Sequence, residues 1–149
     1  MMWMLLSGSV RRLVMMMSNP RKAKGTAWET AVVNFLRRAT GALVFRPRQE
    51  GSYDKGDVHI GEDFALQCKN WERWSKQDLY NWVDDADAQA AHAGRAWGAA
   101  VVKRKRAVGS TGTVGTGIVA MSVDTFGSIV YDLVEGREAI AKLEEISDE

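Results

Sequence analysis

Apolar residues recur at two different spacings along the chain, and each spacing predicts one kind of element. Steps of three and four residues predict amphipathic helices at residues 26–38 and 76–93, and a closing helix at 136–146. Short apolar and β-branched runs between turn-forming residues predict strands. The expected strands are residues 42–46, 57–60, 64–69, 98–103, 118–122 and 129–133.

Capping and turn residues set the boundaries of these elements. Thr26 is the expected N-cap of the first helix, with Glu29 in the capping-box position, and Gly41 is its stop signal. Ser75 is the expected N-cap of the second helix. Turn residues at 61–63 join the second and third strands into a hairpin. Helices and strands in this order predict an α/β fold with a central mixed sheet flanked by helices.

The length and composition favour one globular domain. The chain has 149 residues, of which 46% are hydrophobic and 26% charged, and this balance argues against disorder. We expect the domain to span residues 21–149 and residues 1–20 to form a poorly ordered leader. The apolar stretch before Arg11 is too short to cross a bilayer, and the arginines follow it, whereas a signal peptide carries its charge first. No membrane association is expected.

Cysteine content and charge narrow the functional classes. A single cysteine, Cys68, excludes an intrachain disulfide and fits the reducing cytoplasm, which is the host's if a phage encodes the chain. With two histidines beside it, the chain cannot build a structural zinc site of the usual type. The formal net charge of +1 excludes a polycation, so any nucleic-acid surface has to come from clustering. Basic residues do cluster, at 21–24, 37–38, 46–48 and 103–106.

The clearest chemical signal lies in the predicted hairpin. Asp57 begins its first strand, while Gln67 and Lys69 stand two residues apart on its second strand and therefore share a face. Phosphodiester hydrolysis with Mg²⁺ requires hard oxygen ligands, which Asp57, Gln67 and the backbone carbonyl of Cys68 can supply. Lys69 can orient the attacking water or stabilise the transition state as a point charge.

Glu29 joins this set through a resemblance. Residues 24–29 (KGTAWE), 51–52 (GS), 56–58 (GDV) and 66–69 (LQCK) resemble the PD-(D/E)xK nuclease superfamily, and within it most of all the small archaeal-type and phage Holliday junction resolvases. The similarity covers most of the chain, from about Lys24 to Lys105. A bare Asp…(Glu/Gln)-x-Lys pattern is weakly specific, and the upstream glutamate and the glycine-serine loop make it more so.

The resemblance implies a homodimeric endonuclease that cuts branched DNA with Mg²⁺ or Mn²⁺, built on the restriction-endonuclease-like fold. It implies Glu29 and Asp57 as catalytic metal ligands, Lys69 as the catalytic lysine, and Ser52 beside the scissile phosphate. Gln67 departs from the family pattern, in which Glu is usual, and should weaken metal binding. The expected DNA contacts are Lys24, Arg48, Ser52, Lys55, Arg73, Lys76, Gln77, Lys103, Arg104 and Lys105.

Two alternatives stay open on the sequence. A restriction-type or repair-type nuclease on the same fold would share the metal site and differ only in its substrate. A non-catalytic DNA-binding module is favoured by Gln67, and opposed by the joint presence of Glu29, Asp57 and Lys69. Without the family pattern, Glu29 would be an ordinary capping residue.

Overall fold

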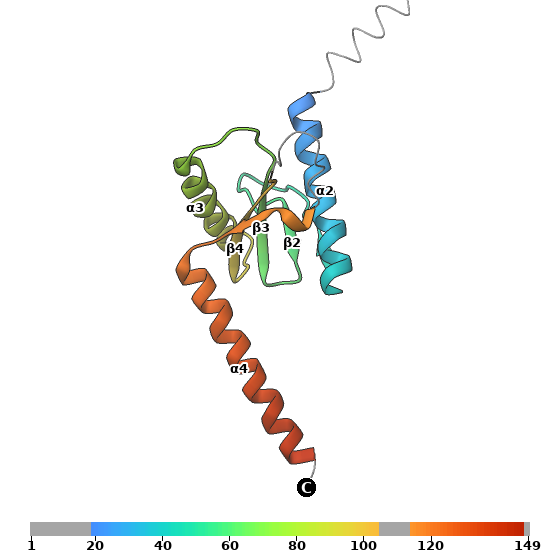
Figure 1. Cartoon of the computed structure of the whole chain (residues 1–149), viewed down its shortest axis with the longest axis vertical. Coiled ribbons are helices and arrows are strands. Elements are labelled where there is room, and N and C mark those ends of the chain that lie inside the picture. The colour runs from blue at the N-terminus through green and yellow to red at the C-terminus, as the bar shows by residue number, and fades with distance from the viewer. Residues whose placement is uncertain (1–18, 105–113, 148–149) are drawn as a thin grey trace, which may run out of the picture.

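A five-stranded mixed sheet forms the centre of the protein, whose computed structural model describes residues 19–104 and 114–147 (Figure 1). The strands lie side by side in chain order, and every neighbouring pair is antiparallel except β3 and β4. Parallel strands need a crossover connection, which α3 provides. The elements are α2 (Pro20–Thr40), β1 (Val44–Phe45), β2 (Val58–Ile60), β3 (Phe64–Lys69), α3 (Lys76–His92), β4 (Trp97–Val102), the 3-10 helix η1 (Val114–Thr116), β5 (Ile118–Ala120) and α4 (Val123–Ser147).

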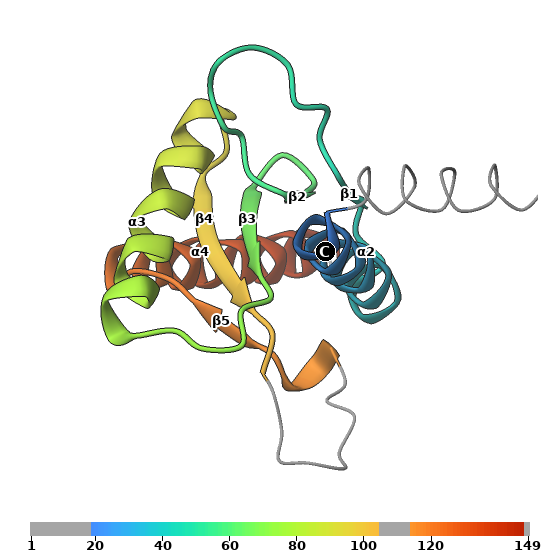
Figure 2. The same ribbon diagram turned by 90° about the horizontal axis from the view of Figure 1, so that it is seen from above.

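Helices α2 and α3 flank the sheet (Figures 1 and 2) and cover its two faces. The side chains of β4 show the division, because Ala99 and Val101 pack in the core under α2, whereas Ala100 and Val102 pack in the core under α3. This alternation is what a strand covered on both faces requires. The indole Nε1 of Trp28 fastens α2 to β4 by donating to the Val101 carbonyl oxygen at 3.1 Å.

The α/β class and several boundaries agree with the sequence. β3 has the bounds expected for it, and α3 begins directly after Ser75. Ser75 Oγ accepts the Asp78 N–H at 3.1 Å, and the Asp78 carboxylate accepts the Ser75 N–H at 2.7 Å, which is a complete capping box. Gly41 ends α2 in the left-handed region, with φ of 66°.

The prediction that Thr26 caps the first helix is wrong, because α2 begins six residues earlier in the sequence, at Pro20. Asn19 is the N-cap, and its side-chain oxygen accepts the Arg21 N–H at 3.1 Å. Proline at the first helical position is preorganised for this start. Residues 19 and 20, expected in the leader, therefore open the helix. Glu29 lies in the third turn and is not a capping residue.

The strand predicted at 129–133 is also wrong, since those residues lie within the 25-residue helix α4. Their β-branched and aromatic content favours a strand locally. Read over a longer window, however, the apolar residues from Phe126 to Leu143 follow the helical spacing. Gly136, expected to open the closing helix, lies in its interior.

Some expectations concern residues that are not described. Residues 1–18, Lys105 and most of the loop predicted at 108–117 lie outside the described ranges; the end of that loop contains η1. Among the helices of the described residues, none has the length and apolarity needed to cross a membrane.

Helix α3 packs closely against the sheet at Gly98, and this packing yields a stability prediction. A Cβ at this position would lie 2.2 Å from the Ala86 carbonyl oxygen and 2.8 Å from the Asp87 nitrogen, both backbone atoms of α3. We expect Gly98→Ala to lower the free energy of unfolding by about 1–3 kcal/mol or more, because α3 must move off the sheet. Urea denaturation measures the change.

The matched control is Gly127→Ala in α4, where a Cβ meets nothing within 4 Å. Helix propensity should make that variant equal to or more stable than the wild type, by up to about 1 kcal/mol. Equal stability of Gly98→Ala and the wild type would contradict the close packing of α3 on β4.

Candidate active site

A pocket of about 790 Å³ opens where β3 ends, beside the N-terminal half of α2. Three of the predicted catalytic residues line it: Glu29 from α2, Asp57 just before β2, and Lys69 at the end of β3. Cys68 lines it as well. Lys24 and Arg73, two of the predicted DNA contacts, also line this pocket. The other lining residues are Arg21, Gly25, Asn70, Trp71 and Glu72.

Asp57 is fixed against β3 by two hydrogen bonds, one from its backbone N–H and one to its carboxylate. The Asp57 N–H donates to the Leu66 carbonyl oxygen at 2.8 Å, and the Cys68 N–H donates to Asp57 Oδ2 at 2.7 Å. Burial raises the pKa of Asp57 above its ordinary value, and the Cys68 hydrogen bond and the Lys69 charge only partly oppose this effect. The Cys68 N–H thus holds Oδ2 in place and makes no bond to Oδ1, the other oxygen of the carboxylate.

Glu29 lines the same pocket from α2 and interacts electrostatically with the Asp57 carboxylate. Its side chain is 17% exposed and forms an ion pair with Arg46, the residue that follows β1. Burial raises the pKa of Glu29, the charge of Asp57 raises it further, and Arg46 opposes both effects. The two carboxylates therefore repel each other electrostatically, and the Arg46 charge only partly opposes the rise in the pKa of Glu29.

The thiol of Cys68 is not set up for nucleophilic chemistry. Burial, followed by the charges of Asp57 and Glu29, raises the pKa of the Cys68 thiol well above its ordinary range. It is therefore a neutral thiol at physiological pH, and thiolate attack requires the opposite environment. What Cys68 contributes to the pocket is its backbone, because its N–H holds the Asp57 carboxylate.

Lys69 is oriented by Gln67, its neighbour on the same face of β3. With the Gln67 amide nitrogen donating to the Trp82 carbonyl oxygen at 3.1 Å, its amide oxygen accepts from Lys69 Nζ at 3.2 Å. Lys69 Nζ also lies 5.8 Å from the centroid of the Trp82 ring. Gln67 itself is 7% exposed and is not among the residues that line the pocket. The predicted shared face is confirmed, and Gln67 contacts Lys69 rather than the open space.

A polar network holds the Gln67 amide from behind. Gln89 of α3 donates from Nε2 to the Gln67 amide oxygen at 3.0 Å and to Asp54 Oδ2 at 2.8 Å. Asp54 Oδ1 in turn accepts the Gly56 N–H at 2.9 Å. Gly56 adopts φ of 88°, and a Cβ there would lie 3.3 Å from the Leu66 carbonyl oxygen. The loop that delivers Asp57 is thereby connected to the residue that orients Lys69.

Sequence reasoning missed Asp54, Gln89 and the pairing role of Arg46. A signal for Gln89 was present, since it is a polar residue on the buried face of α3, next to Ala90 and in line with Ala86. Buried polar side chains need partners, so such a position marks a network. Arg46 was counted only as part of a basic cluster, because nothing local in the sequence pairs it with Glu29.

The remaining predicted DNA contacts lie outside the pocket. Ser52 is exposed in the loop between β1 and β2, and exposed Gln77 donates to Asn81 Oδ1 at 2.9 Å. Lys103 is nearer, because its N–H donates to the Lys69 carbonyl oxygen at 2.8 Å. Arg48, Lys55, Lys76 and Arg104 are also absent from the pocket lining, and Lys105 is not described.

The raised pKa of Asp57 predicts how stability depends on pH. The folded protein holds this proton more tightly than the unfolded chain, so the free energy of unfolding falls as pH rises from about 3.8 through the raised folded pKa. Asp57→Asn, which cannot ionise, should therefore have a higher Tm than the wild type at pH 7 without divalent cations. The difference should vanish at pH 3.5, where Asp57 is protonated.

Asp78→Asn serves as the control, since its hydrogen bonds from Ser75 lower the pKa of Asp78. That variant should lose stability at neutral pH and approach the wild type in acid. Thermal melts followed by circular dichroism measure both variants. A lower Tm for Asp57→Asn than for the wild type at pH 7 would show that the ionised Asp57 side chain does not destabilise the fold.

Comparisons with models of known protein families, with curated proteins and with solved structures found no match to this chain.

Proposed function

We propose that this protein is a metal-dependent DNA endonuclease, with Glu29, Asp57 and Lys69 at its active centre. The observation that carries the proposal is that these three residues, from α2, the start of β2 and the end of β3, line one pocket. Two carboxylates and an ammonium in one open site are the groups that phosphodiester hydrolysis uses.

The two carboxylates fit a divalent cation such as Mg²⁺ or Mn²⁺. Mg²⁺ binds through one or two protein carboxylates, several waters and substrate phosphate, and does not need a cage of protein ligands. Within the described residues no group of three or more His, Cys, Asp or Glu side chains forms such a cage. Glu29 and Asp57 supply hard carboxylate oxygens, and the Cys68 carbonyl is a third donor of the same class. The chemistry supplied by such a cation is the activation of water and the offsetting of charge at phosphorus.

The protein's own side chains have separate tasks in this proposal. Asp57, held by the Cys68 N–H, presents a carboxylate oxygen without a large loss of side-chain freedom on binding. Lys69 stabilises negative charge that develops on the phosphate oxygens, and Gln67 keeps its Nζ in place. Lys24, Arg73 and Arg21 bind the flanking phosphates, which positions the strand without reading its bases.

This division of tasks assigns Gln67 to positioning, in contrast to the metal-ligand role expected from the sequence. Its amide is engaged with Trp82, Gln89 and Lys69, so both of its polar atoms are already satisfied inside the protein. The site then contains two carboxylates where the resembled superfamily commonly has three acidic groups.

As the substrate we propose branched DNA, most specifically the four-way junction, cut by a homodimer with two such pockets. Recognition through phosphates selects by the placement of strands, which suits a substrate defined by its shape. The second candidate is a DNA-binding module without catalysis, which the reduced acidic content at Gln67 favours.

Cleavage of labelled four-way junction, fork and linear duplex DNA with Mg²⁺, Mn²⁺ or EDTA tests both functions. We expect paired nicks in the junction that EDTA abolishes. Asp57→Ala and Lys69→Ala should each lower the cleavage rate by about a hundredfold or more, with DNA affinity largely kept. Lys142→Ala is the matched control, because Lys142 is exposed on α4, lies outside the pocket and is not among the expected DNA contacts.

Cleavage at the wild-type rate by Asp57→Ala would show that the pocket takes no part in the reaction. Equal cutting of all three substrates would show that the protein is a general repair-type or restriction-type nuclease and is not specific for the junction. Junction binding without cutting under every metal condition would favour the non-catalytic module.

Gln67→Glu separates the two roles of Gln67. A carboxylate cannot donate to the Trp82 carbonyl oxygen, so this variant leaves a buried acceptor without its partner. We expect a loss of about 1–3 kcal/mol in the free energy of unfolding and slower cleavage. Asn81→Asp, the same amide-to-carboxylate change at an exposed position on α3, is the control and should match the wild type. Faster cleavage by Gln67→Glu with unchanged stability would instead make residue 67 a metal ligand.

A further inference from the structure

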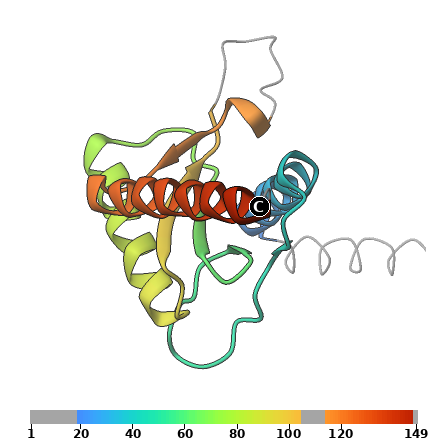
Figure 3. The same ribbon diagram turned by 90° about the horizontal axis from the view of Figure 1, so that it is seen from below.

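Helix α4 is the longest helix described, and it leaves its apolar side uncovered. It extends away from the body formed by the sheet, α2 and α3 (Figure 1), and Figure 3 shows it as the part nearest the viewer from below. None of its residues is buried, and Phe126 and Leu143 are 58% and 66% exposed. At 1.5 Å per residue it is about 37 Å long.

Although Val130, Tyr131 and Val134 are exposed elsewhere on α4, six of its residues form one apolar stripe. They alternate between steps of three and four residues, which keeps them on a single face of a helix. The stripe consists of Phe126, Ile129, Leu133, Gly136, Ile140 and Leu143. A continuous apolar surface of this length marks an interaction site, and tertiary or quaternary packing is what stabilises most helices.

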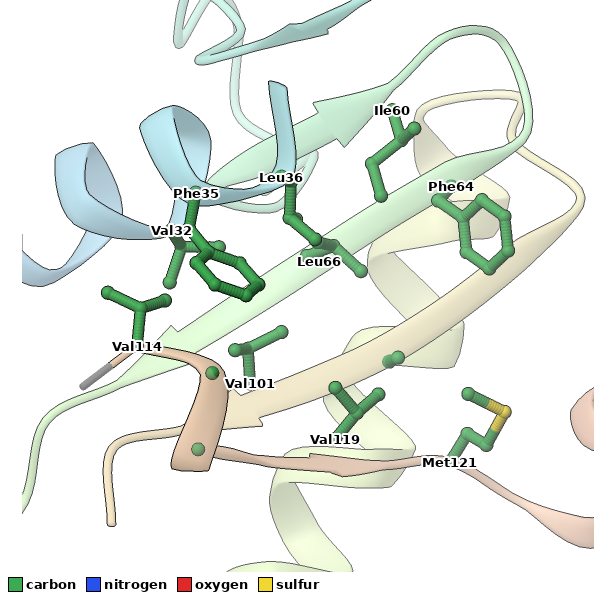
Figure 4. A pocket seen from close by; sticks show the side chains of 13 residues that line it. Val32, Phe35, Leu36, Ile60, Phe64, Leu66, Val101, Val114, Val119 and Met121 are labelled. Atoms are coloured by element: carbon green, nitrogen blue, oxygen red, sulfur yellow. The ribbon is translucent and has the colours of Figure 1, made fainter. Parts of the chain in front are cut away.

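A complementary surface lies on the sheet face covered by α2. An apolar groove of about 210 Å³ opens there between α2, β4, η1 and β5 (Figure 4). Val32 and Phe35 enter it from α2, and Val119 and Met121 from the β5 edge. Val119 is 57% exposed, although it is paired with Val101 in the sheet and points to the same face. The edge of the core is thus open beside β5.

The helix that follows this groove in the same chain is directed away from it. Thr125 Oγ1 donates to Asp87 Oδ1 of α3 at 3.2 Å, and Trp97 Nε1 donates to Ser128 Oγ at 3.0 Å. Ser122 Oγ caps the turn by accepting the Thr125 N–H at 3.1 Å. The first bond ties the start of α4 to α3, and the second ties it to Trp97, which shares the face of β4 covered by α2 with Ala99 and Val101. Only residues 121–122 separate β5 from α4. Folding α4 back onto its own groove would have to break the bond to α3.

We infer that α4 of a second copy of this chain occupies the groove, and that α4 of the first copy occupies the groove of the second in return. This reciprocal arrangement is called the exchange below. The charges agree with this choice. Acidic side chains outnumber basic ones on α4, whereas α2, which borders the groove, carries several cations and one acid. The acids of α4 are Asp124, Asp132, Glu135, Glu138, Glu144 and Glu145; the cations of α2 next to its groove-lining residues Phe35 and Leu36 are Arg37 and Arg38.

Pairing of two α4 helices with each other would place like charges together, which lowers the stability of a helix pair. A reciprocal exchange has two-fold symmetry and fills both grooves, so no third chain can add and the assembly is a dimer. The exchange goes beyond the proposed nuclease activity and does not require it, because it is measured by mass and not by cleavage.

The mass of the full chain in solution gives the first test. Light scattering after size exclusion should show a dimer at tens of micromolar protein. Leu133→Glu, in the middle of the stripe, should give a monomer, because a charge cannot enter the apolar groove. Asp132→Asn, the neighbouring position outside the stripe, should stay dimeric. A monomeric wild-type protein, or a dimeric Leu133→Glu protein, would overturn the inference.

Cross-linking identifies what each α4 contacts. In a Cys68→Ser background, chains carrying Val119→Cys are co-expressed with chains carrying Ile140→Cys and treated with a short thiol-to-thiol cross-linker. The exchange predicts a covalent product between the two different chains. A product between two Ile140→Cys chains would show helix-to-helix pairing and contradict the exchange. A chain carrying both cysteines that cross-links only within itself would show that α4 fills its own groove, with the same consequence.

Discussion

β3 has hydrogen-bonded neighbours on both sides and helices on both faces, so the alternation of its side chains decides what can meet what. Leu66 and Cys68 point to the core under α2, which leaves Gln67 and Lys69 on the side of α3. The backbone of the same strand holds Asp57 through the Cys68 N–H. A register shift of one residue would exchange the two sets and separate the ammonium from the carboxylate. The pocket therefore depends on the register of one strand.

The pocket also keeps two acidic side chains in partly buried positions, where their charged forms lower the stability of the fold. Glu29 and Asp57 are largely withdrawn from water, and each has its pKa raised chiefly by that burial. A protein selected only for stability would replace such groups or pair them fully. Arg46 offsets part of the charge, and the network of Gln67, Gln89 and Asp54 adds neutral hydrogen bonds around it. Retained charge of this kind is typical of sites that bind a charged ligand.

Much of this arrangement is legible in the sequence where the signal is local. Period-two alternation and a flanking turn predict β3, and Ser75 followed by Asp78 predicts the start of α3. The α2 start was missed because Thr26 is a plausible cap taken alone, while the stronger combination of Asn19 and Pro20 lies upstream. The strand at 129–133 was wrong because a five-residue window cannot show the periodicity of a 25-residue helix. Pairings between distant residues, such as Arg46 with Glu29 or Gln89 with Gln67, have no local signature at all.

Helix α4 has a consequence for how the protein behaves as its concentration changes. None of its residues is buried, so the sheet with α2 and α3 can form its core without α4. A helix without packing is only marginally populated in water, and this one also contains two interior glycines, Gly127 and Gly136. If its packing comes from another molecule, the ordering of α4 is a bimolecular event governed by mass action. Dilution would then melt the 25-residue helix α4 while leaving the pocket lined by Glu29, Asp57 and Lys69 folded.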